Sequence, residues 1–453
     1  MDPRLRALNR FGLGARIGER DRMDDPRGWL EAQLGSSGRG ATLDEPSLTT
    51  LDEAGAALRA VRMAGRSGDQ AAAAEARRSL RSLTAHEVAV VQRHRIRTDA
   101  PFVERLVAFW SNHLCVSVGK VQVAPVAGHY ERTVIRPHVL GRFEEMVLAS
   151  ARHPAMLAYL DNAQSIGPRS RAARGSARRG RERGLNENYA RELLELHTVG
   201  VDGGYGQEDV EQLALILTGW SVSGIGPRDR SRSYGFAFRP EVHEPGDKRV
   251  LGRTYRASGE EEGRAVIRDL CRRPETARFV STKLVRHFVA DDPPPDAVDQ
   301  LTSTFQETEG DLREVSRALV RLDSAWDQVH LKLRHPQDWL TAVFRAVNAD
   351  EAAPRAGQIL RQLRHTQWAP PSPKGYGDRV VDWADPDSLM NRAELARSLS
   401  QRAGRRSGVT ARSLMSVLDL AEDDPLVTLL TDTDVLVDER VALVLGGPAF
   451  QWR

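Results

Sequence analysis

Residues 186–200 have the sequence NENYARELLELHTVG, whose apolar spacing predicts an amphipathic α-helix over 186–199. At about 100° per residue, Asn188, Glu192 and Glu195 fall on one narrow stripe of this helix, with Arg191 beside it. The opposite arc is apolar and consists of Tyr189, Ala190, Leu193, Leu194 and Leu196. One side of the helix is therefore expected to pack against a core, and the other to carry dense polar chemistry.

The polar stripe has two interpretations. Two carboxylates at i and i+3, Glu192 and Glu195, can share a metal ion, as in carboxylate-bridged helical bundles, or act as an acid and base pair. Alternatively the stripe is a solvated face whose i,i+4 ion pairs contribute only a few tenths of a kcal/mol each. The Asn-rich start of the segment argues against a plain charged face, because Asn is a poor helix former, although Asn186 can serve as the N-cap. The sequence predicts Glu192 and Glu195 as metal ligands, and both residues with Asn188 and Arg191 as catalytic groups.

Helical periodicity extends from this segment along most of the chain. The predicted helices span 5–36 (short helices), 51–96 (two helices broken at Gly65–Gly68), 101–113, 128–136, 137–151, 154–160, 207–220, several stretches of 260–350, 386–402, 409–420, 423–431 and 434–446. Residues 165–184 are predicted to be a basic linker, residues 221–258 an irregular insert with a small β-hairpin, and residues 369–373 a rigid proline-rich connector. The expected fold is a mainly α, large multi-helix domain with irregular loops.

Four sub-regions are expected within one unit. They are N-terminal helices (1–100), a region holding the site (101–258), a helical region (259–365), and a proline-rich connector followed by C-terminal helices (366–453).

Composition excludes several classes of protein. The hydrophobic content is 40% in 453 residues, and no run of about 18 apolar residues occurs, so no membrane-spanning helix is expected. The charged N-terminal segment, residues 1–6, lacks an apolar signal region, which predicts a cytoplasmic protein. Two cysteines, Cys115 and Cys271, cannot build a disulfide framework or a zinc site of cysteines alone. The formal net charge of +3 is too small to indicate nucleic-acid binding by itself.

Histidines outside the 186–200 segment supply the candidate imidazoles. His113 lies near the C-terminus of a predicted helix, where it can ligate a metal or haem, act as a base, or cap the last carbonyls. His243 and Lys248 lie in a loop, a common location for functional residues. His243 is predicted to complete the metal site with Glu192, Glu195 and His113, and Lys248 to neutralise an anionic substrate. An ordinary solvated loop is the alternative for His243 and Lys248.

Two basic clusters have structural alternatives. Residues 129–138, which include Glu131, Arg132 and Arg136, could bind an anion, but we expect Arg–carboxylate pairing inside a helical core. The segment 169–183 carries seven arginines and could hold phosphates or RNA. It contains no aromatic residue for base stacking, so we expect a solvated loop there and no nucleic-acid partner.

Several segments together resemble the bacterial domain of unknown function 1800 family. They are NRFGLG at 9–14, FWSNH at 109–113, HPAML at 153–157, LDN at 160–162, residues 186–200, LTGW at 217–220, the loop at 238–252 and GPAFQ at 447–451. The resemblance covers nearly the whole chain and implies one family unit, but it brings no known reaction. It also implies an exported protein encoded beside a sulfatase-like partner, whereas this N-terminus has no obvious export signal. Family members usually carry His-Asp where this chain has His243-Glu244.

The sequence therefore predicts a metal-dependent enzyme that acts on a small-molecule or peptide-like substrate, with Zn, Mn or Fe held by oxygen-rich ligands and imidazoles. Three alternatives stay open: a non-catalytic helical scaffold or partner-binding protein, a haem protein using His113, and phosphate or nucleic-acid binding through the arginine-rich segment. The HExxH, GxSxG, Walker A, GxGxxG and CxxC motifs do not occur, which argues against the common enzyme classes that they mark.

Overall fold

Helices make up most of the computed structural model, which describes residues 2–35, 42–43, 45–177, 184–225, 233–327, 332–403, 409–418, 420, 424–432 and 434–453. Within these residues the strands form two short antiparallel hairpins. β1 (Trp220–Ser223) pairs with β2 (Gly235–Phe238), and β3 (Lys248–Val250) pairs with β4 (Arg253–Tyr255). The predicted mainly α fold with a small β element near 221–258 is confirmed, and this region holds two hairpins where one was expected.

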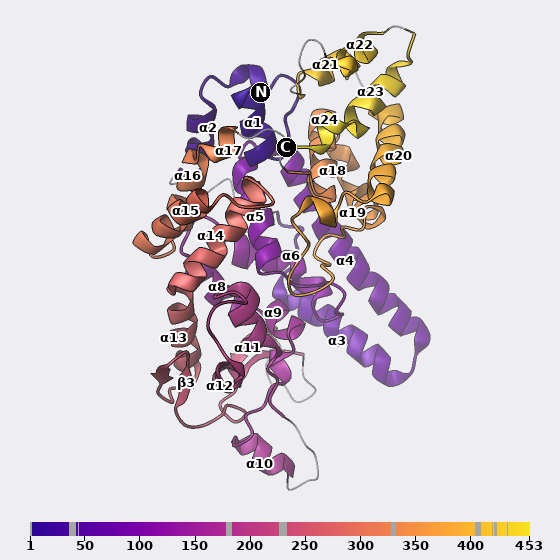
Figure 1. Cartoon of the computed structure of the whole chain (residues 1–453). Helices are drawn as coiled ribbons and strands as arrows, with labels where there is room; N and C mark the ends of the chain where they lie inside the picture. The colour runs from indigo at the N-terminus through magenta and orange to yellow at the C-terminus, as the bar shows by residue number, and fades with distance from the viewer. Residues whose placement is uncertain are drawn as a thin grey trace.

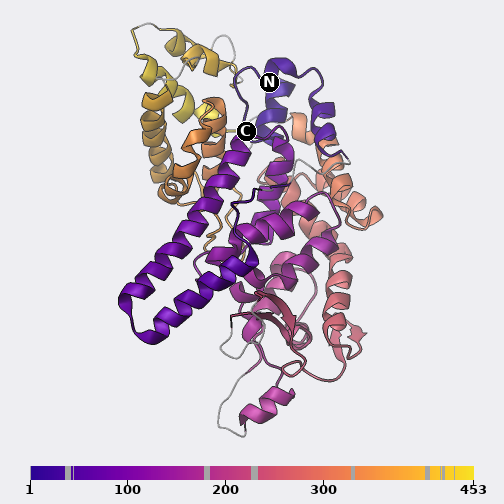
Figure 2. The same cartoon turned by 180° about the vertical axis from the view of Figure 1, so that it is seen from behind.

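A long helical hairpin projects from the body of the molecule as an arm (Figures 1 and 2). It consists of α3 (Leu51–Ser67) and α4 (Gln70–Arg97). α3 ends at Gly68, whose φ of 73° is a left-handed conformation that glycine adopts without strain. The predicted break between the two helices at Gly65–Gly68 is therefore confirmed.

The N-terminal segment packs around a central helix. The elements are α1 (Pro3–Arg6), the π turn η1 (Ala7–Phe11), the 3-10 turn η2 (Arg20–Arg22), α2 (Pro26–Gln33) and the central α5 (Pro101–His113). α5 has the predicted bounds and begins with a proline, where the missing N–H donor costs no hydrogen bond. Phe11 of η1 packs edge-on against Phe102 of α5, with ring centroids 5.8 Å apart. α5 is thus buried on several sides.

A helical run with a π turn follows α5. Its elements are η4 (Ala124–Val126), α6 (Ala127–Tyr130), the π turn η5 (Glu131–Ile135), α7 (Arg136–His138), α8 (Phe143–Arg152) and α9 (Pro154–Tyr159). The predicted helix start at Pro137 is wrong, because helical turns continue through Pro137 and the next helix begins at Phe143. Pro137 lies in the first turn of the short α7, where a residue without an N–H donor is tolerated.

The 186–199 segment is helical as predicted, but its hydrogen-bond pattern changes midway. The region comprises η6 (Asn162–Gln164), α10 (Arg171–Ala177), α11 (Asn188–Glu192), the π turn η7 (Leu193–His197) and α12 (Gln207–Leu217). Because η7 follows Glu192, the constant 100° rotation used for the polar stripe does not hold as far as Glu195. The basic linker 165–184 contains a helical turn, α10, and its residues 178–183 lie outside the described part of the chain.

Helices also dominate the described residues of the second half of the chain. Its elements are α13 (Glu260–Cys271), α14 (Pro274–Phe288), α15 (Pro295–Glu307), α16 (Leu312–Arg321), α17 (Ser324–Asp327), α18 (Pro336–Ala346), η8 (Asp350–Ala352), α19 (Ala353–Gln362), η9 (Val380–Asp382), α20 (Pro386–Ala403), α21 (Ala411–Met415), α22 (Pro425–Thr431), α23 (Val437–Gly446) and α24 (Pro448–Gln451). α20 to α24 gather at one end of the molecule, near the N-terminal helices (Figure 1).

The connector, residues 366–385, is more than a spacer between α19 and α20. It leaves the C-terminal helices, returns to the centre of the molecule and contacts the segment after α5 (Figure 1). The N–H of Val118 donates to the carbonyl of Trp368 over 2.8 Å. The connector therefore brings late-sequence residues to the C-terminal end of α5.

One hydrophobic core runs through all these parts. A single cluster of buried residues extends from Leu5 to Phe450 and includes residues of α5, α14 and α18. Among the described residues, no helix is both long and apolar enough to cross a membrane.

Candidate metal centre

The principal cavity has a volume of about 630 Å³ and lies where the connector meets α5. The C-terminal half of α5, the last turns of α14, the start of α18 and the connector form its walls. A cavity of this size can enclose a small ligand or a short peptide side chain. Its walls come from segments that are far apart in the sequence, so only the complete fold creates it.

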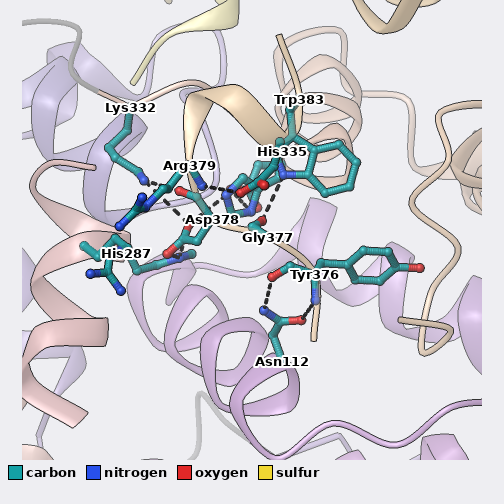
Figure 3. A network of polar contacts seen from close by, with 12 residues as sticks. Asn112, His287, Lys332, His335, Tyr376, Gly377, Asp378, Arg379 and Trp383 are labelled. Atoms are coloured by element: carbon teal, nitrogen blue, oxygen red, sulfur yellow. Dashed lines mark hydrogen bonds and ion pairs between the residues drawn. The ribbon is translucent and has the colours of Figure 1, made fainter. Parts of the chain in front are cut away.

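Three potential metal ligands meet in this cavity wall. His287, His335 and Asp378 each offer one ligand atom, and these atoms all lie within 4.8 Å of one another. His287 is in the last turn of α14, His335 directly precedes α18, and Asp378 is in the connector. Figure 3 shows Asp378 between the two imidazole rings. Within the described part of the chain, this is the one group of three or more His, Cys, Asp or Glu residues with such spacing.

Within the triad, Nε2 of His287 and Nε2 of His335 have no hydrogen-bond partner. Nδ1 of His287 lies 3.1 and 3.2 Å from the two carboxylate oxygens of Asp378. Nε2 of His335 lies 2.8 Å from Oδ1 of Asp378, but this contact lacks hydrogen-bond geometry. The three side chains thus surround one small space. Imidazole nitrogens and a carboxylate are suitable ligands for Zn²⁺, Mn²⁺ or Fe²⁺.

Asn112 fixes the connector next to Asp378. Its Nδ2 donates to the carbonyl of Tyr376 over 3.0 Å, and its Oδ1 accepts the N–H of Tyr376 over 2.8 Å (Figure 3). Gly375 has a φ of 86°, and a Cβ there would lie 2.6 Å from the carbonyl oxygen of Asn112. Glycine is required at this close approach. The indole Nε1 of Trp383 donates to the carbonyl of Gly377 over 2.9 Å, which holds the other side of the turn.

A buried lysine and two aspartates surround the triad. Lys332 donates to the backbone carbonyl of Asp378 and to Oδ1 of Asp291. The second oxygen of Asp291 accepts the N–H of Val380 over 2.6 Å. Nδ1 of His335 lies 4.0 Å from Asp338. Such outer contacts orient ligands, because a metal-binding side chain must be held by its other polar atoms.

Burial and charge set the protonation of the triad. Burial lowers the pKa of His287 to about 3, so its imidazole is neutral near pH 7. Burial disfavours the carboxylate of Asp378, but the electrostatic effect of His287 and its hydrogen bond hold the pKa of Asp378 well below its usual range. A neutral imidazole beside a carboxylate is the protonation state that binds metal.

Aromatic rings form a platform beside the triad. The ring of His365 lies 4.0 Å from that of Tyr376 and 5.0 Å from that of Trp383, centroid to centroid. The hydroxyl of Tyr376 donates to connector carbonyls and so is engaged in holding the loop. The three rings therefore pack against one another at the side of the triad.

Comparison with known proteins gives one match. The family model described as protein of unknown function (DUF1800) matches residues 6–452. The chain belongs to the DUF1800 family. No curated protein and no solved structure gives a significant match. The family resemblance expected from the sequence is therefore confirmed over nearly the whole chain, while the chemistry of this DUF1800 protein has to be inferred from its own residues.

The predicted stripe on the 186–200 segment has mainly local partners in this DUF1800 protein. Glu195 accepts a hydrogen bond from the hydroxyl of Tyr205 over 3.3 Å. Asn188 donates to the carbonyl of Leu160 over 3.5 Å. The other stripe residue, Glu192, is partly buried, and burial together with the charge of Glu195 raises its pKa. A catalytic role for Glu192, Glu195 and Asn188 stays a prediction.

Arg191 pairs along its own helix and with the next one. Its guanidinium lies 3.2 Å from the carboxylate of Glu187 and donates to Gln207 over 2.8 Å. These are the helix-surface pairs of the solvated-face interpretation. The predicted catalytic role of Arg191 is not tested by these contacts.

His113 lines the principal cavity but is engaged elsewhere. Its Nε2 donates to the backbone carbonyl of His197 over 3.1 Å, and burial lowers its pKa well below the usual value. Its ring stacks on Phe109 at 6.3 Å. The sequence placed His113 correctly at the end of α5, and its haem role stays a prediction.

His243 and Lys248 form a separate buried network around Glu262. Nε2 of His243 contacts Oε1 of Glu262, and Nζ of Lys248 lies 3.0 and 3.1 Å from its two oxygens. Lys248 also donates to the carbonyl of Glu244 over 2.6 Å. Lys248 therefore neutralises a buried glutamate of the protein itself. The four predicted ligands Glu192, Glu195, His113 and His243 do not form a metal-binding group in the described part of the chain.

The two basic clusters behave as structural elements where they are described. Arg136 pairs with Glu104 and Glu131 inside the core, as expected for residues 129–138. In the arginine-rich segment, Arg169 pairs with Glu244, and its backbone N–H donates to the same carboxylate over 2.8 Å. Four of the seven arginines lie in 178–183, outside the described residues.

No local pattern in the sequence marks His287, His335 or Asp378 as site residues. Each is separated from the next by more than forty residues, so no spacing motif marks them. One signal was available for Asp378, which follows the Gly375-Tyr376-Gly377 turn in a proline-rich loop. Polar residues on a loop held by a rigid scaffold are frequent functional residues.

We expect the Asn112→Ala variant to bind a divalent metal about 10–100-fold more weakly, because the backbone next to Asp378 loses both hydrogen bonds that orient it. Titration with Zn²⁺ followed by calorimetry measures this change. The matched control is Asn188→Ala, the same substitution at a residue outside the triad, for which no change is expected. Equal affinities for the two variants would contradict the positioning role of Asn112.

Proposed function

We propose that this protein is a metal-dependent enzyme whose metal is held by His287, His335 and Asp378 and whose substrate, a small molecule or peptide-like group, occupies the cavity beside them. The observation that carries the proposal is the convergence of three ligand atoms within 4.8 Å in the wall of the principal cavity. The proposed ligands differ from those predicted from the sequence, but the proposed class of protein, a metal-dependent enzyme, is the same.

The number and type of ligands support a catalytic site over a closed structural one. Structural zinc sites have four protein ligands, whereas catalytic sites keep a position open for water or substrate. Two imidazoles and one carboxylate are a ligand set known for catalytic zinc and for non-haem iron. A metal bound here would supply Lewis-acid polarisation of a substrate oxygen.

The protein's own groups have distinct roles in this proposal. Asn112 and Trp383 orient the turn that carries Asp378. Nζ of Lys332 donates to the backbone carbonyl of Asp378 and so fixes the backbone at this residue. The rings of His365 and Tyr376 shape one wall and limit the approach of water. These contacts preorganise the ligands, which is what a catalytic metal site requires.

A scaffold is the second candidate, because Asp378 also takes part in a charge network with Lys332. Nζ of Lys332 lies 3.7 Å from Oδ1 of Asp378, which provides charge compensation without a metal. In a scaffold these pairs would hold the connector onto the core and nothing more.

Turnover measurements separate the two candidates. Full-length protein is assayed with chromogenic phosphate, sulfate and carboxylate esters and amino-acid anilides, after chelation and after reloading with Zn²⁺, Mn²⁺ or Fe²⁺. The enzyme proposal predicts turnover that chelation removes, that one metal restores, and that His335→Gln lacks. The matched control is His86→Gln, an exposed histidine on the arm. Turnover that survives chelation, or no metal uptake by the wild type, would support the metal-free alternatives.

A further inference from the structure

A lysine lies next to the triad without an acidic partner of its own. Lys283 is on α14, one helical turn before His287, so the two side chains share a face of the helix. The side chain is partly buried and lines the principal cavity. Nζ of Lys283 lies over the ring of Phe279, 5.6 Å from the ring centroid. Among the described residues, no carboxylate forms an ion pair with Lys283.

Two further cationic side chains, those of Arg286 and Lys374, line the cavity near Lys283. Burial lowers the pKa of Lys283 to about 8; Cys115 and Asp378 oppose this shift electrostatically, and the charges of Arg286 and Lys374 add to it. Arg286 comes from α14 and Lys374 from the connector, so the three cations approach from two walls. All three cations therefore line the same cavity, and Nε of Arg286 also donates to the backbone carbonyl of Asp291 over 3.4 Å.

The other titratable groups near Lys283 either have contacts of their own or are neutral. Asp378 contacts both imidazoles of the triad and lies 3.7 Å from Lys332. Cys115 also lines the cavity, but burial raises the pKa of its thiol to about 12, so it is neutral near pH 7. The imidazoles of His113 and His197 are neutral as well, since burial lowers their pKa values.

Lys283 and Arg286 are partly withdrawn from water, whereas Lys374 is exposed. Partial burial of a charge without a counter-ion costs free energy, and an anion that enters the cavity relieves this cost. We propose that Lys283, Arg286 and Lys374 form a subsite for an oxyanion group of the substrate, a phosphoryl or sulfuryl group, beside the metal centre. A tetrahedral oxyanion offers at least three oxygens to the donors of three cations, whereas a carboxylate offers only two. The role as a substrate subsite rests on the proposed function, but binding of an oxyanion does not require the metal.

The test uses full-length protein from which metal has been removed with a chelator, and calorimetric titration with sodium sulfate at low ionic strength. The wild type is expected to bind sulfate at one site, and Lys283→Gln is expected to weaken this binding by at least about tenfold. The control Lys120→Gln removes a lysine that pairs with Asp161 outside the cavity, and it should bind sulfate as the wild type does. Absence of saturable binding in the wild type, or equal affinities of Lys283→Gln and wild type, would overturn the proposal.

Two further measurements identify the class of anion and distinguish the oxyanion subsite from the metal centre. Inorganic phosphate should bind like sulfate and acetate much more weakly, so acetate binding as tight as sulfate would overturn the assignment of a tetrahedral group. Lys283→Gln should still take up Zn²⁺, because Lys283 is not a ligand. If the wild type binds sulfate but no metal, and Lys283→Gln loses the sulfate binding, the metal proposal fails and the oxyanion subsite stands.

Discussion

Replacing Arg136 with methionine is expected to lower the free energy of unfolding by about 3–5 kcal/mol, the largest stability effect that the structure indicates. Arg136 is fully buried, and its guanidinium bonds to Glu104 and Glu131 at distances between 2.5 and 3.0 Å. The substitution keeps an unbranched apolar side chain but removes the guanidinium, which leaves two buried carboxylates without their main counter-ion. Urea unfolding of both proteins measures the change.

The matched control for Arg136 is an exposed pair. Arg278 lies 2.7 Å from Asp299, and both side chains are about 60% exposed. Arg278→Met is expected to change the free energy of unfolding by less than about 1 kcal/mol, because water and salt screen such pairs. Comparable losses in the two variants would contradict the structural role of the buried network.

The same network makes stability depend on pH. Burial opposes the ionisation of Glu104, but the charges of Arg136 and His94 outweigh burial and lower its pKa to about 2. The folded-state pKa is below the unfolded value of 4.5, so the ionised carboxylate stabilises the fold above that value. This contribution decreases as the pH falls from 4.5 towards about 2.

Asp378→Asn is expected to weaken metal binding by at least about 100-fold and to abolish metal-dependent turnover. Loss of an outer-shell partner alone costs about 10–100-fold in metal affinity, and loss of a charged ligand costs more. Asparagine keeps the shape of the side chain and can still contact His287 and His335, so the effect reports the charge. Metal titration of wild type and variant measures it.

The control for Asp378 lies on the same connector. Asp382 also lines the cavity, but its carboxylate accepts the N–H of Arg379 over 2.9 Å and so caps the short η9 turn. Asp382→Asn should retain the metal affinity of the wild type. An equal loss in both variants would indicate that any change in the connector disturbs the site, and would contradict a ligand role specific to Asp378.

Local patterns in the sequence predicted much of the fold. Residues 101–113 form a helix with the predicted bounds because a proline, an apolar face and no breaker act within that segment. The break at Gly65–Gly68 likewise depends on one glycine with a positive φ. The same rule gave a wrong helix start at Pro137, which lies in the first turn of the three-residue α7, while the next long helix begins at Phe143.

The candidate site could not be predicted in the same way. The polar stripe from Asn188 to Glu195 was derived with a constant helical rotation, and the π turn after Glu192 changes that rotation. The triad depends instead on the return of the connector to α5, a long-range contact made by Asn112 and Gly375. No local periodicity encodes such a contact, so His287, His335 and Asp378 became visible only in the folded chain.

Anomalous diffraction from crystals soaked in Zn²⁺ or Mn²⁺ tests the metal centre most directly. We expect one strong anomalous peak within coordination distance of His287, His335 and Asp378, at the wall of the principal cavity. Crystals of Asp378→Asn should lack this peak. A peak between Glu192 and Glu195, or no peak in the triad of the wild-type protein, would contradict the account.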